Sequence, residues 1–298
     1  MSESNSAGGP LQPAAEALER EIEARVRADQ GGVRTFFDNY LLRTIHMLRG
    51  LDSQGRWEDA ALRVPGARGE RLRTRVARLR AAIARRGAAR LAEYAARQPV
   101  LPEAAPWPSA IDPATLAMSQ GTAECMHWRG QPLFKTAFDF AVYSMLMWDL
   151  RPCTVLEIGS GSGASALWLA DLQSLAATGG HVYSLDLHPP SATHPGISFL
   201  SGDCRRIAEA LPARLLDDLP HPWLVIEDAH VNVAGVLTHL HGFIVAGDYM
   251  VVEDSAEKQG EITAFLSAAP GAYKVDTRYT DFFGRNATCA FDSIFVRV

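Results

Sequence analysis

The stretch "TVLEIGSGSGAS", Thr154 to Ser165, decides the fold of this 298-residue chain. An apolar run ends in one acid, Glu157, and glycines then follow at alternate positions, Gly159, Gly161 and Gly163. Residues without a Cβ let the chain turn sharply from a strand into a helix and let a ligand approach the backbone. Ligands of open α/β sheets bind at the carboxyl ends of the strands. The stretch therefore predicts a strand, a binding loop and a helix in succession.

The spacing of the glycines and the acid before them indicate the kind of ligand. The pattern is G-x-G-x-G rather than the G-x-G-x-x-G of dinucleotide-binding folds. A carboxylate at Glu157 would repel a pyrophosphate, whereas S-adenosylmethionine carries a sulfonium and an ammonium group and no phosphate. A purely structural strand-to-helix turn is the alternative for such a loop taken alone. We expect contacts to S-adenosylmethionine from Glu157, Gly159, Ser160 and Gly161.

Composition sets the class of protein. The chain is 47% hydrophobic and 21% charged, which suits a folded protein of one large domain with or without an appendage. Its net charge of −5 argues against a nucleic-acid partner. We see no signal peptide and no membrane-spanning run, so a cytoplasmic location without membrane partners is expected. The cysteines show no metal-ligand spacing and are expected to be reduced thiols: Cys125, Cys153, Cys204 and Cys289.

The first third of the sequence has a different pattern from the rest. Residues 1–13 are rich in Ser, Gly and Pro and are expected to be disordered. Residues 14–118 form the expected helical region, with apolar residues recurring at three and four positions, as in Phe37, Leu41, Ile45 and Leu48. A Pro-rich segment at 99–113 marks the boundary to a second domain over 119–298.

The role of the helical region has more than one interpretation. Its helices can cover a pocket as a lid or can pair two copies, and we expect a homo-oligomer. The arginine-rich stretch over 70–98 is either a solvated helix face or a polyanion-binding helix. The first interpretation is favoured because no aromatic residues interleave the arginines and the whole chain is acidic.

Strands and helices alternate after Thr154, which predicts a mostly parallel sheet covered on both faces. The end of the sequence, "YKVDTRYTDFFG" to "DSIFVRV", is expected to form two strands with a loop and no crossover helix, which would pair antiparallel at one edge. This gives an α/β, Rossmann-like sheet with an antiparallel C-terminal strand. The five expected parallel strands are "TVLEIG", "HVYSLDL", "ISFLSGD", "WLVIEDAH" and "YMVVEDS".

Every one of these five strands ends in an acid, and parallel strands bring their carboxyl ends to one rim. Asp186 can accept hydrogen bonds from two ribose hydroxyls. Asp203 can accept from the adenine amine while the backbone at Gly202 faces the ring. The acids expected at the rim are Glu157, Asp186, Asp203, Glu227, Asp228, Glu253 and Asp254.

The sequence resembles the class I S-adenosylmethionine-dependent methyltransferases. More narrowly it is similar to the cephalosporin hydroxylase family, which includes the methyltransferase of cephamycin methoxylation. The resemblance covers about residues 119–298, and the first 118 residues have no counterpart in it. It is carried by "HWRGQPLFKTAFDFAVY" (127–143), "VLEIGSGSGASALWLA" (155–170), "EDAH" (227–230), "GDYMVVEDS" (247–255) and "FGRNAT".

This resemblance implies a magnesium site made of Asp228, Glu253 and Asp254, with Asp228 also beside the cofactor. Mg²⁺ prefers carboxylate and water oxygens and lowers the pKa of a bound hydroxyl. The sequence departs from a D-x-x-H pattern, because Asp228 is followed by Ala229 and His230. His230 is then a candidate catalytic base with Asp228, or a structural histidine.

The resemblance and the motifs together predict an S-adenosylmethionine-dependent O-methyltransferase acting on a small molecule, in natural-product biosynthesis. A metal-independent carboxylate or N-methyltransferase is the alternative, since a carboxylate acceptor is already anionic. A non-catalytic ligand-binding partner of the same fold is a second alternative. An NAD(P)-dependent oxidoreductase is disfavoured by the glycine spacing and by the absence of Tyr-x-x-x-Lys.

Overall fold

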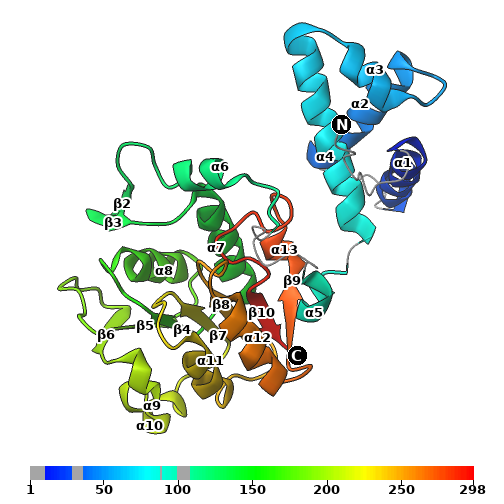
Figure 1. Cartoon of the computed structure of the whole chain (residues 1–298). Coiled ribbons are helices and arrows are strands. Elements are labelled where there is room, and N and C mark those ends of the chain that lie inside the picture. The colour runs from blue at the N-terminus through cyan, green and yellow to red at the C-terminus, as the bar shows by residue number, and fades with distance from the viewer. Residues whose placement is uncertain (1–10, 29–35, 88, 99–107) are drawn as a thin grey trace. The chain divides into compact units, whose positions relative to one another are not determined.

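The computed structural model describes residues 11–28, 36–87, 89–98 and 108–298. The chain divides into two compact units, Met1–Ala89 and Arg90–Val298 (Figure 1). The expected disorder of residues 1–10 lies outside the described residues. The first helix begins at Leu11, so the expectation of disorder is wrong for residues 11–13.

The first unit is helical, as expected from its apolar spacing. Ile22, Ile45, Leu48, Trp57 and Leu79 are among its fully buried side chains. Phe37, which the apolar spacing placed on the buried stripe, is instead 69% exposed. The helices are α1 (Leu11–Ala28), α2 (Phe36–Leu51), α3 (Trp57–Arg63) and α4 (Gly66–Gly87).

The second unit contains an eight-stranded sheet in the order β1-β9-β10-β8-β7-β4-β5-β6. Five strands, from β6 to β8 in this order, run parallel, and β10 lies antiparallel between β8 and β9. The predicted parallel sheet with an antiparallel C-terminal strand is confirmed. The strands are β1 (Leu91–Ala92), β4 (Thr154–Ile158), β5 (His181–Asp186), β6 (Ile197–Ser201), β7 (Trp223–Glu227), β8 (Tyr249–Val252), β9 (Tyr273–Asp276) and β10 (Ile294–Arg297).

Alternating side chains of the central strands bury both faces of the sheet. Val155 and Leu224 face one core with α7 (Ala137–Leu150) and α8 (Ala164–Leu175), while Leu156 and Val225 face the other. That second core is closed by α11 (Val233–His241) and α12 (Gln259–Ala268) (Figure 1). Such two-sided burial explains why these strands are continuous apolar runs.

The boundary between the units differs from the predicted one. It falls at residues 89 and 90, before the Pro-rich segment, of which residues 99–107 lie outside the described part. Residues 90–98 belong to the sheet unit because β1 pairs antiparallel with β9. Their arginines also bind carboxylates of that unit, Arg90 to Asp276 and Arg97 to Asp281. The helix predicted to continue to Gln98 ends at Gly87.

Two other local features differ from the sequence pattern. The helix expected after β6 is split into η1 (Cys204–Arg206), α9 (Ile207–Ala210) and α10 (Ala213–Leu216), because Pro212 cannot continue a helix. A short hairpin of β2 (Met126–Trp128) and β3 (Gln131–Leu133) precedes α7, and a short helix α6 (Pro113–Met118) precedes the hairpin.

All four cysteines are free thiols, as expected. Across the described ranges, the helices are too short or too polar to cross a lipid bilayer.

Candidate functional site

The glycine loop joins β4 to α8 and turns with positive φ angles. Gly159 has φ +107°, and a Cβ there would lie 2.8 Å from the backbone carbonyl of Asp228. Gly161 has φ +48° and faces open space, so its backbone is free to meet a ligand. The loop therefore passes so close to the end of β7 that only a residue without a Cβ fits at position 159.

Asp186 fixes this loop at the end of the neighbouring strand β5. Its Oδ2 accepts hydrogen bonds from the backbone N–H of Ser160, at 2.9 Å, and of Gly161, at 3.1 Å. Its Oδ1 accepts from the backbone N–H of His188. The carboxylate is thus held at the mouth of the loop, where a ribose could approach it.

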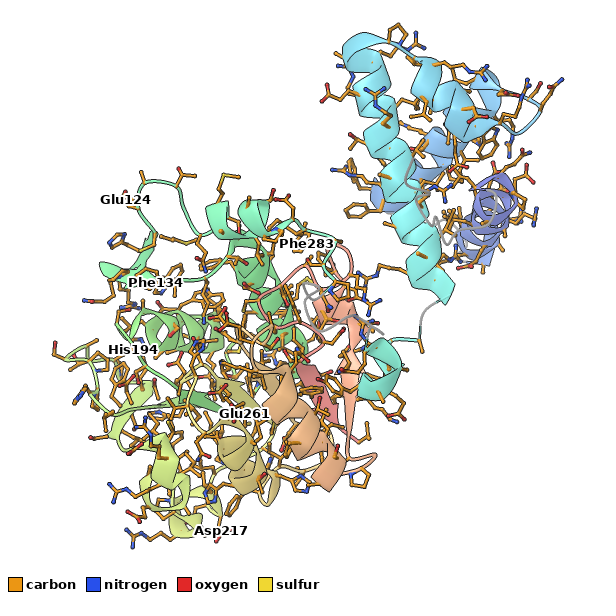
Figure 2. All side chains as sticks on the ribbon, viewed as in Figure 1. Glu124, Phe134, His194, Asp217, Glu261 and Phe283 are labelled. Carbon is orange, nitrogen blue, oxygen red and sulfur yellow. The ribbon has the colours of Figure 1, made fainter. Side chains whose placement is uncertain are left out.

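A cavity of about 320 Å³ lies over the glycine loop and the strand ends. Most of the residues predicted to bind the cofactor line it: Gly159, Ser160, Gly161, Asp186, Gly202, Asp203 and Asp228. Asp203 accepts a hydrogen bond from the N–H of Arg205, which fixes the start of η1. Phe134, labelled in Figure 2, follows β3, is 66% exposed and lines the same cavity.

Glu157, which was expected to contact the cofactor, is not among the described residues that line this cavity. It is 1% exposed, and its Oε2 accepts a hydrogen bond from the Ser184 hydroxyl on β5. Burial raises the pKa of Glu157 to about 7. Side chains alternate along a strand, so Glu157 lies on the α7–α8 face with Val155 rather than at the rim.

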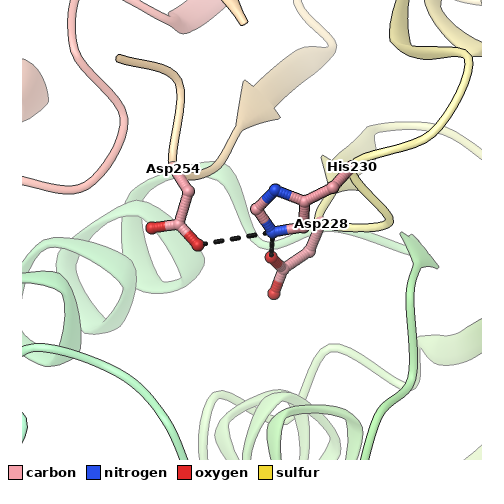
Figure 3. A group of neighbouring side chains, drawn as sticks. All are labelled: Asp228, His230 and Asp254. Carbon is pink, nitrogen blue, oxygen red and sulfur yellow. Dashed lines mark ion pairs between the residues drawn. The ribbon is translucent and has the colours of Figure 1, made fainter. Parts of the chain in front are cut away.

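Three side chains at the ends of β7 and β8 form a cluster that could hold a metal ion. Ligand atoms of Asp228, His230 and Asp254 all lie within 4.8 Å of one another. Figure 3 shows one nitrogen of the His230 ring facing both carboxylates, with Nε2 at 3.4 Å from Asp228 and 3.5 Å from Asp254. Hydrogen bonding to Asp228 raises the pKa of His230.

Glu253 is not part of this cluster, although it was expected as a metal ligand. It is 2% exposed, forms an ion pair with Lys135 and accepts a hydrogen bond from the Tyr143 hydroxyl at 2.5 Å. Its position along β8 puts it on the face covered by α7, which carries Tyr143. His230 is the third member of the cluster instead. Asp254, which follows Glu253 in the chain, has a left-handed backbone with φ +44°.

Lys135 connects the buried acid to the rim. Its ammonium lies 3.1 Å from Oδ2 of Asp228, and it lines the cavity. Burial lowers the pKa of Lys135, but Glu253 and Asp228 outweigh burial and hold the pKa well above its usual value.

The pKa values of the two acids around Lys135 shift in opposite directions. Burial raises the pKa of Asp228, but the Lys135 charge outweighs it and holds the pKa below its usual range. Burial and then the Asp228 charge raise the pKa of Glu253 far above its usual value. Burial therefore acts in the same direction on both acids, and the Lys135 charge outweighs it only at the partly exposed Asp228.

A second cavity, of about 380 Å³, adjoins the cluster. It shares His230 and Asp254 with the cluster and is otherwise bounded by α6, by the residues after β8 and by residues before β10. Its lining residues are Pro113, Leu116, Ala117, Gln120, Thr136, His230, Asp254, Ala256, Glu257, Cys289 and Phe291.

The sequence-based prediction missed Lys135, Tyr143 and the second cavity. One signal for Lys135 was available, because the chain has only three lysines. Two of them, Lys135 and Lys258, are buried and form ion pairs with acids at strand ends. Lys258 binds Glu227, which therefore also lies away from the cofactor cavity.

Comparison with protein families identifies relatives of the second unit. The family model described as Rhamnosyl O-methyltransferase/CmcI matches residues 120–271. The rhamnosyl O-methyltransferase of Mycobacterium leprae is 30% identical over 178 residues, which are 53% of this chain and 77% of that protein. The protein of the same name from Mycobacterium tuberculosis H37Rv is 27% identical over 166 residues, covering 52% of this chain and 66% of its own length.

Solved structures of CmcI share the fold. A CmcI structure with Mg and S-adenosylmethionine aligns with a TM-score of 0.50 and 24% identity, covering 71% of this chain and 92% of CmcI. An apo structure of CmcI aligns with a TM-score of 0.52 and 22% identity, covering 71% of this chain and 91% of that protein.

Proposed function

The chain belongs to the Rhamnosyl O-methyltransferase/CmcI family and is an S-adenosylmethionine-dependent O-methyltransferase, and we propose that it methylates a hydroxyl group of an uncharged small molecule. One observation carries the proposal. The Asp228–His230–Asp254 cluster lies between two cavities, since Asp228 lines the first, and His230 and Asp254 line the second. A methyl donor in the first and an acceptor in the second would meet at the cluster.

The cofactor is proposed to occupy the first cavity. The open backbone at Gly161 leaves room for the methionine part, Asp186 accepts hydrogen bonds from the ribose hydroxyls, and Asp203 accepts from the adenine amine. Glu157 acts on the cofactor only through the loop, because its carboxylate is buried beside Ser184.

The cluster fits a divalent cation. Two carboxylates and one imidazole supply three donor atoms and leave further positions for water or substrate. Oxygen donors suit Mg²⁺, which is present with S-adenosylmethionine in a CmcI structure, while the imidazole also admits Mn²⁺. When bound, such a cation supplies Lewis-acid polarisation of a hydroxyl.

The chain's own residues have separate tasks in the transfer. The methyl carbon leaves the sulfonium with its bonding electron pair staying on sulfur, and a new bond forms from the acceptor oxygen. With no cation in the cluster, the acceptor's proton goes to His230, which lines the second cavity; with a cation bound there, His230 would be one of its ligands and the cation would lower the pKa of the hydroxyl. Asp228 and Asp254 both face Nε2 of the imidazole, so they orient the ring and stabilise it once it is protonated.

The charge of the second cavity selects the acceptor. Its lining residues include two acids, Asp254 and Glu257, and no lysine or arginine. An anionic acceptor would be repelled there, which argues against the carboxylate-methylating alternative. Leu116, Ala117 and Phe291 give the cavity apolar walls, so a neutral hydroxyl compound with an apolar face, such as a glycoside, is the proposed substrate class. A role in natural-product biosynthesis follows from that chemistry as part of the proposal.

A matched pair of acceptors tests this proposal. The full chain is incubated with methyl-labelled S-adenosylmethionine, Mg²⁺, and 4-nitrophenyl glucoside, rhamnoside or glucuronide. We expect label in the neutral glycosides and little in the glucuronide, which differs from the glucoside by a carboxylate. Label in the glucuronide as a base-labile ester would contradict the acceptor class. Failure of S-adenosylmethionine to bind in calorimetry would contradict the cofactor site.

A further inference from the structure

We propose that the helical unit binds a phosphate ester in an arginine-lined groove between α2 and α4. The groove has a volume of about 320 Å³, within the range of small-molecule sites. Four of the eight residues that line it are arginines, and none is an acid. The lining residues are Arg43, Met47, Leu51, Val64, Arg68, Arg71, Leu72 and Arg75.

The charge of this unit supports an anionic ligand. Residues 1–89 contain sixteen arginines, no lysine and eleven acids, a net charge of +5, while the remaining residues have a net charge of −10. The exclusive use of arginine matters, because its planar fork of N–H groups matches the oxygens of a phosphate in pairs. A lysine offers only a point charge.

The arginines that line the groove differ from their neighbours on α4 in their ion pairs. Among the residues that the structure describes, Arg43, Arg68, Arg71 and Arg75 form no ion pair, whereas Arg80 and Arg86 of the same helix bind Glu58 and Glu21. Like charges three and four residues apart repel each other along a helix. A bound anion would remove that repulsion.

Part of the groove is already ordered for binding. The Arg75 guanidinium lies 4.7 Å from the centre of the Tyr40 ring on α2, and the Arg78 guanidinium lies 5.6 Å from it. The ring attracts these cations through its face without using their N–H groups. The aromatic partner that α4 lacks in sequence is therefore supplied by α2.

The floor of the groove indicates the rest of the ligand. Met47, Leu51, Val64 and Leu72 are apolar and lie beside the arginines. An inorganic phosphate would leave this surface unused. A soluble ester with a phosphate and an apolar group would contact both the arginines and the apolar floor. We therefore assign a soluble phosphate ester, rather than a membrane lipid headgroup, as the ligand.

Calorimetry on the full chain tests the proposal with 1-naphthyl phosphate, with the neutral 1-naphthol and with pyrophosphate. We expect saturable binding of 1-naphthyl phosphate and none of 1-naphthol. The double variant Arg71→Gln/Arg75→Gln should weaken binding at least tenfold. The matched variant Arg63→Gln/Arg73→Gln removes the same charge from positions that do not line the groove and should leave binding unchanged. An equal loss in both double variants, or no saturable binding, overturns the proposal.

A further variant tests the apolar floor without changing the net charge, so its result does not depend on the correct folding of the arginine variants. Leu51→Trp fills the apolar floor, so it should weaken 1-naphthyl phosphate binding while pyrophosphate binding stays the same. Equal binding of 1-naphthyl phosphate to this variant and the wild type overturns the assigned floor. Sedimentation with phosphatidic acid vesicles separates the sources, since vesicle binding without binding of the soluble ester overturns the assignment. S-adenosylmethionine titration should be unaffected in every variant, which keeps this test independent of the methyl transfer site.

Discussion

The ammonium of Lys135 lies 3.1 Å from Oδ2 of Asp228, the acid that lines the first cavity and also belongs to the Asp228–His230–Asp254 cluster. The same ammonium is bound from its other side by the buried Glu253. A positive charge supplied by the protein is therefore fixed next to the reaction site whether or not a cation is bound. Its removal has measurable consequences for stability.

We expect Lys135→Met to reduce the free energy of unfolding by about 3–5 kcal/mol, because it leaves buried acids without their cation. The double variant Lys135→Met/Glu253→Gln should recover part of this loss. Lys274→Met is the control, since Lys274 pairs with the exposed Glu93 and should cost below about 1 kcal/mol. Urea unfolding measures all three, and a Lys135 variant as stable as the control would contradict the assigned charge arrangement.

Asp186→Ala should weaken S-adenosylmethionine binding by about 10- to 100-fold, measured by titration calorimetry. The substitution removes the acceptor of two loop N–H groups, and with it the acceptor proposed for the ribose hydroxyls. Asp217→Ala changes an exposed acid after α10, labelled in Figure 2, and should leave the affinity unchanged. Unchanged affinity in the Asp186 variant would remove this residue from the cofactor site.

Glu157→Gln should stabilise the protein at pH 8 and have little effect near pH 4.5. Burial raises the pKa of Glu157 from 4.5 to about 7, so the folded state keeps a proton that the unfolded chain releases. Wild-type stability therefore falls as the pH rises from about 4.5 through 7, by up to about 3 kcal/mol. Denaturation curves at both pH values check this, with the exposed Glu124→Gln as the control. A gain that is equal at both pH values would refute it.

Removal of divalent metal with EDTA should lower turnover, and Mg²⁺ should restore it. Mn²⁺ binding, followed by electron paramagnetic resonance, should weaken at least tenfold in Asp254→Asn. Glu253→Gln should change it less than threefold, because Glu253 binds Lys135 and Tyr143 instead of joining the cluster. If the Glu253 variant loses as much affinity as the Asp254 variant, the metal set predicted from the resemblance is the correct one.

Leu116→Trp should raise the KM for the neutral glycoside at least tenfold and leave S-adenosylmethionine affinity unchanged. The larger side chain fills the second cavity without reaching the first. Ala114→Trp places the same group on an exposed position of α6 that does not line the cavity and serves as the control. Equal KM values in both variants would remove the second cavity from acceptor binding.

Much of the sheet could be predicted from the sequence because its central strands are buried on both faces. Runs such as Trp223–Glu227 read as continuous apolar segments, and the glycines after Ile158 mark the loop. The acid at Asp186 was predicted for the same reason, since it directly ends a strand. The face of the sheet on which each strand-end side chain lies could not be predicted from the local sequence.

Glu157 and Glu253 illustrate this limit. Both end apolar runs, yet the two-residue period sends both to the face covered by α7 and α8, where Ser184, Tyr143 and Lys135 meet them. Asp254, one residue after Glu253, has a left-handed backbone and belongs to the cluster with Asp228 and His230. The partners come from distant parts of the chain, so no local pattern announces them.

The two-residue strand β1 also determines where the catalytic unit can be cut. It covers the outer edge of β9, and the arginines on either side of it bind Asp276 and Asp292, which are fully buried. A fragment that began near residue 110 would expose a bare row of backbone donors and acceptors and would remove Arg90 from Asp276 and Arg97 from Asp292. Such an edge recruits strands from other molecules, so that fragment would aggregate during expression. A fragment that begins at residue 89 retains its own edge protection.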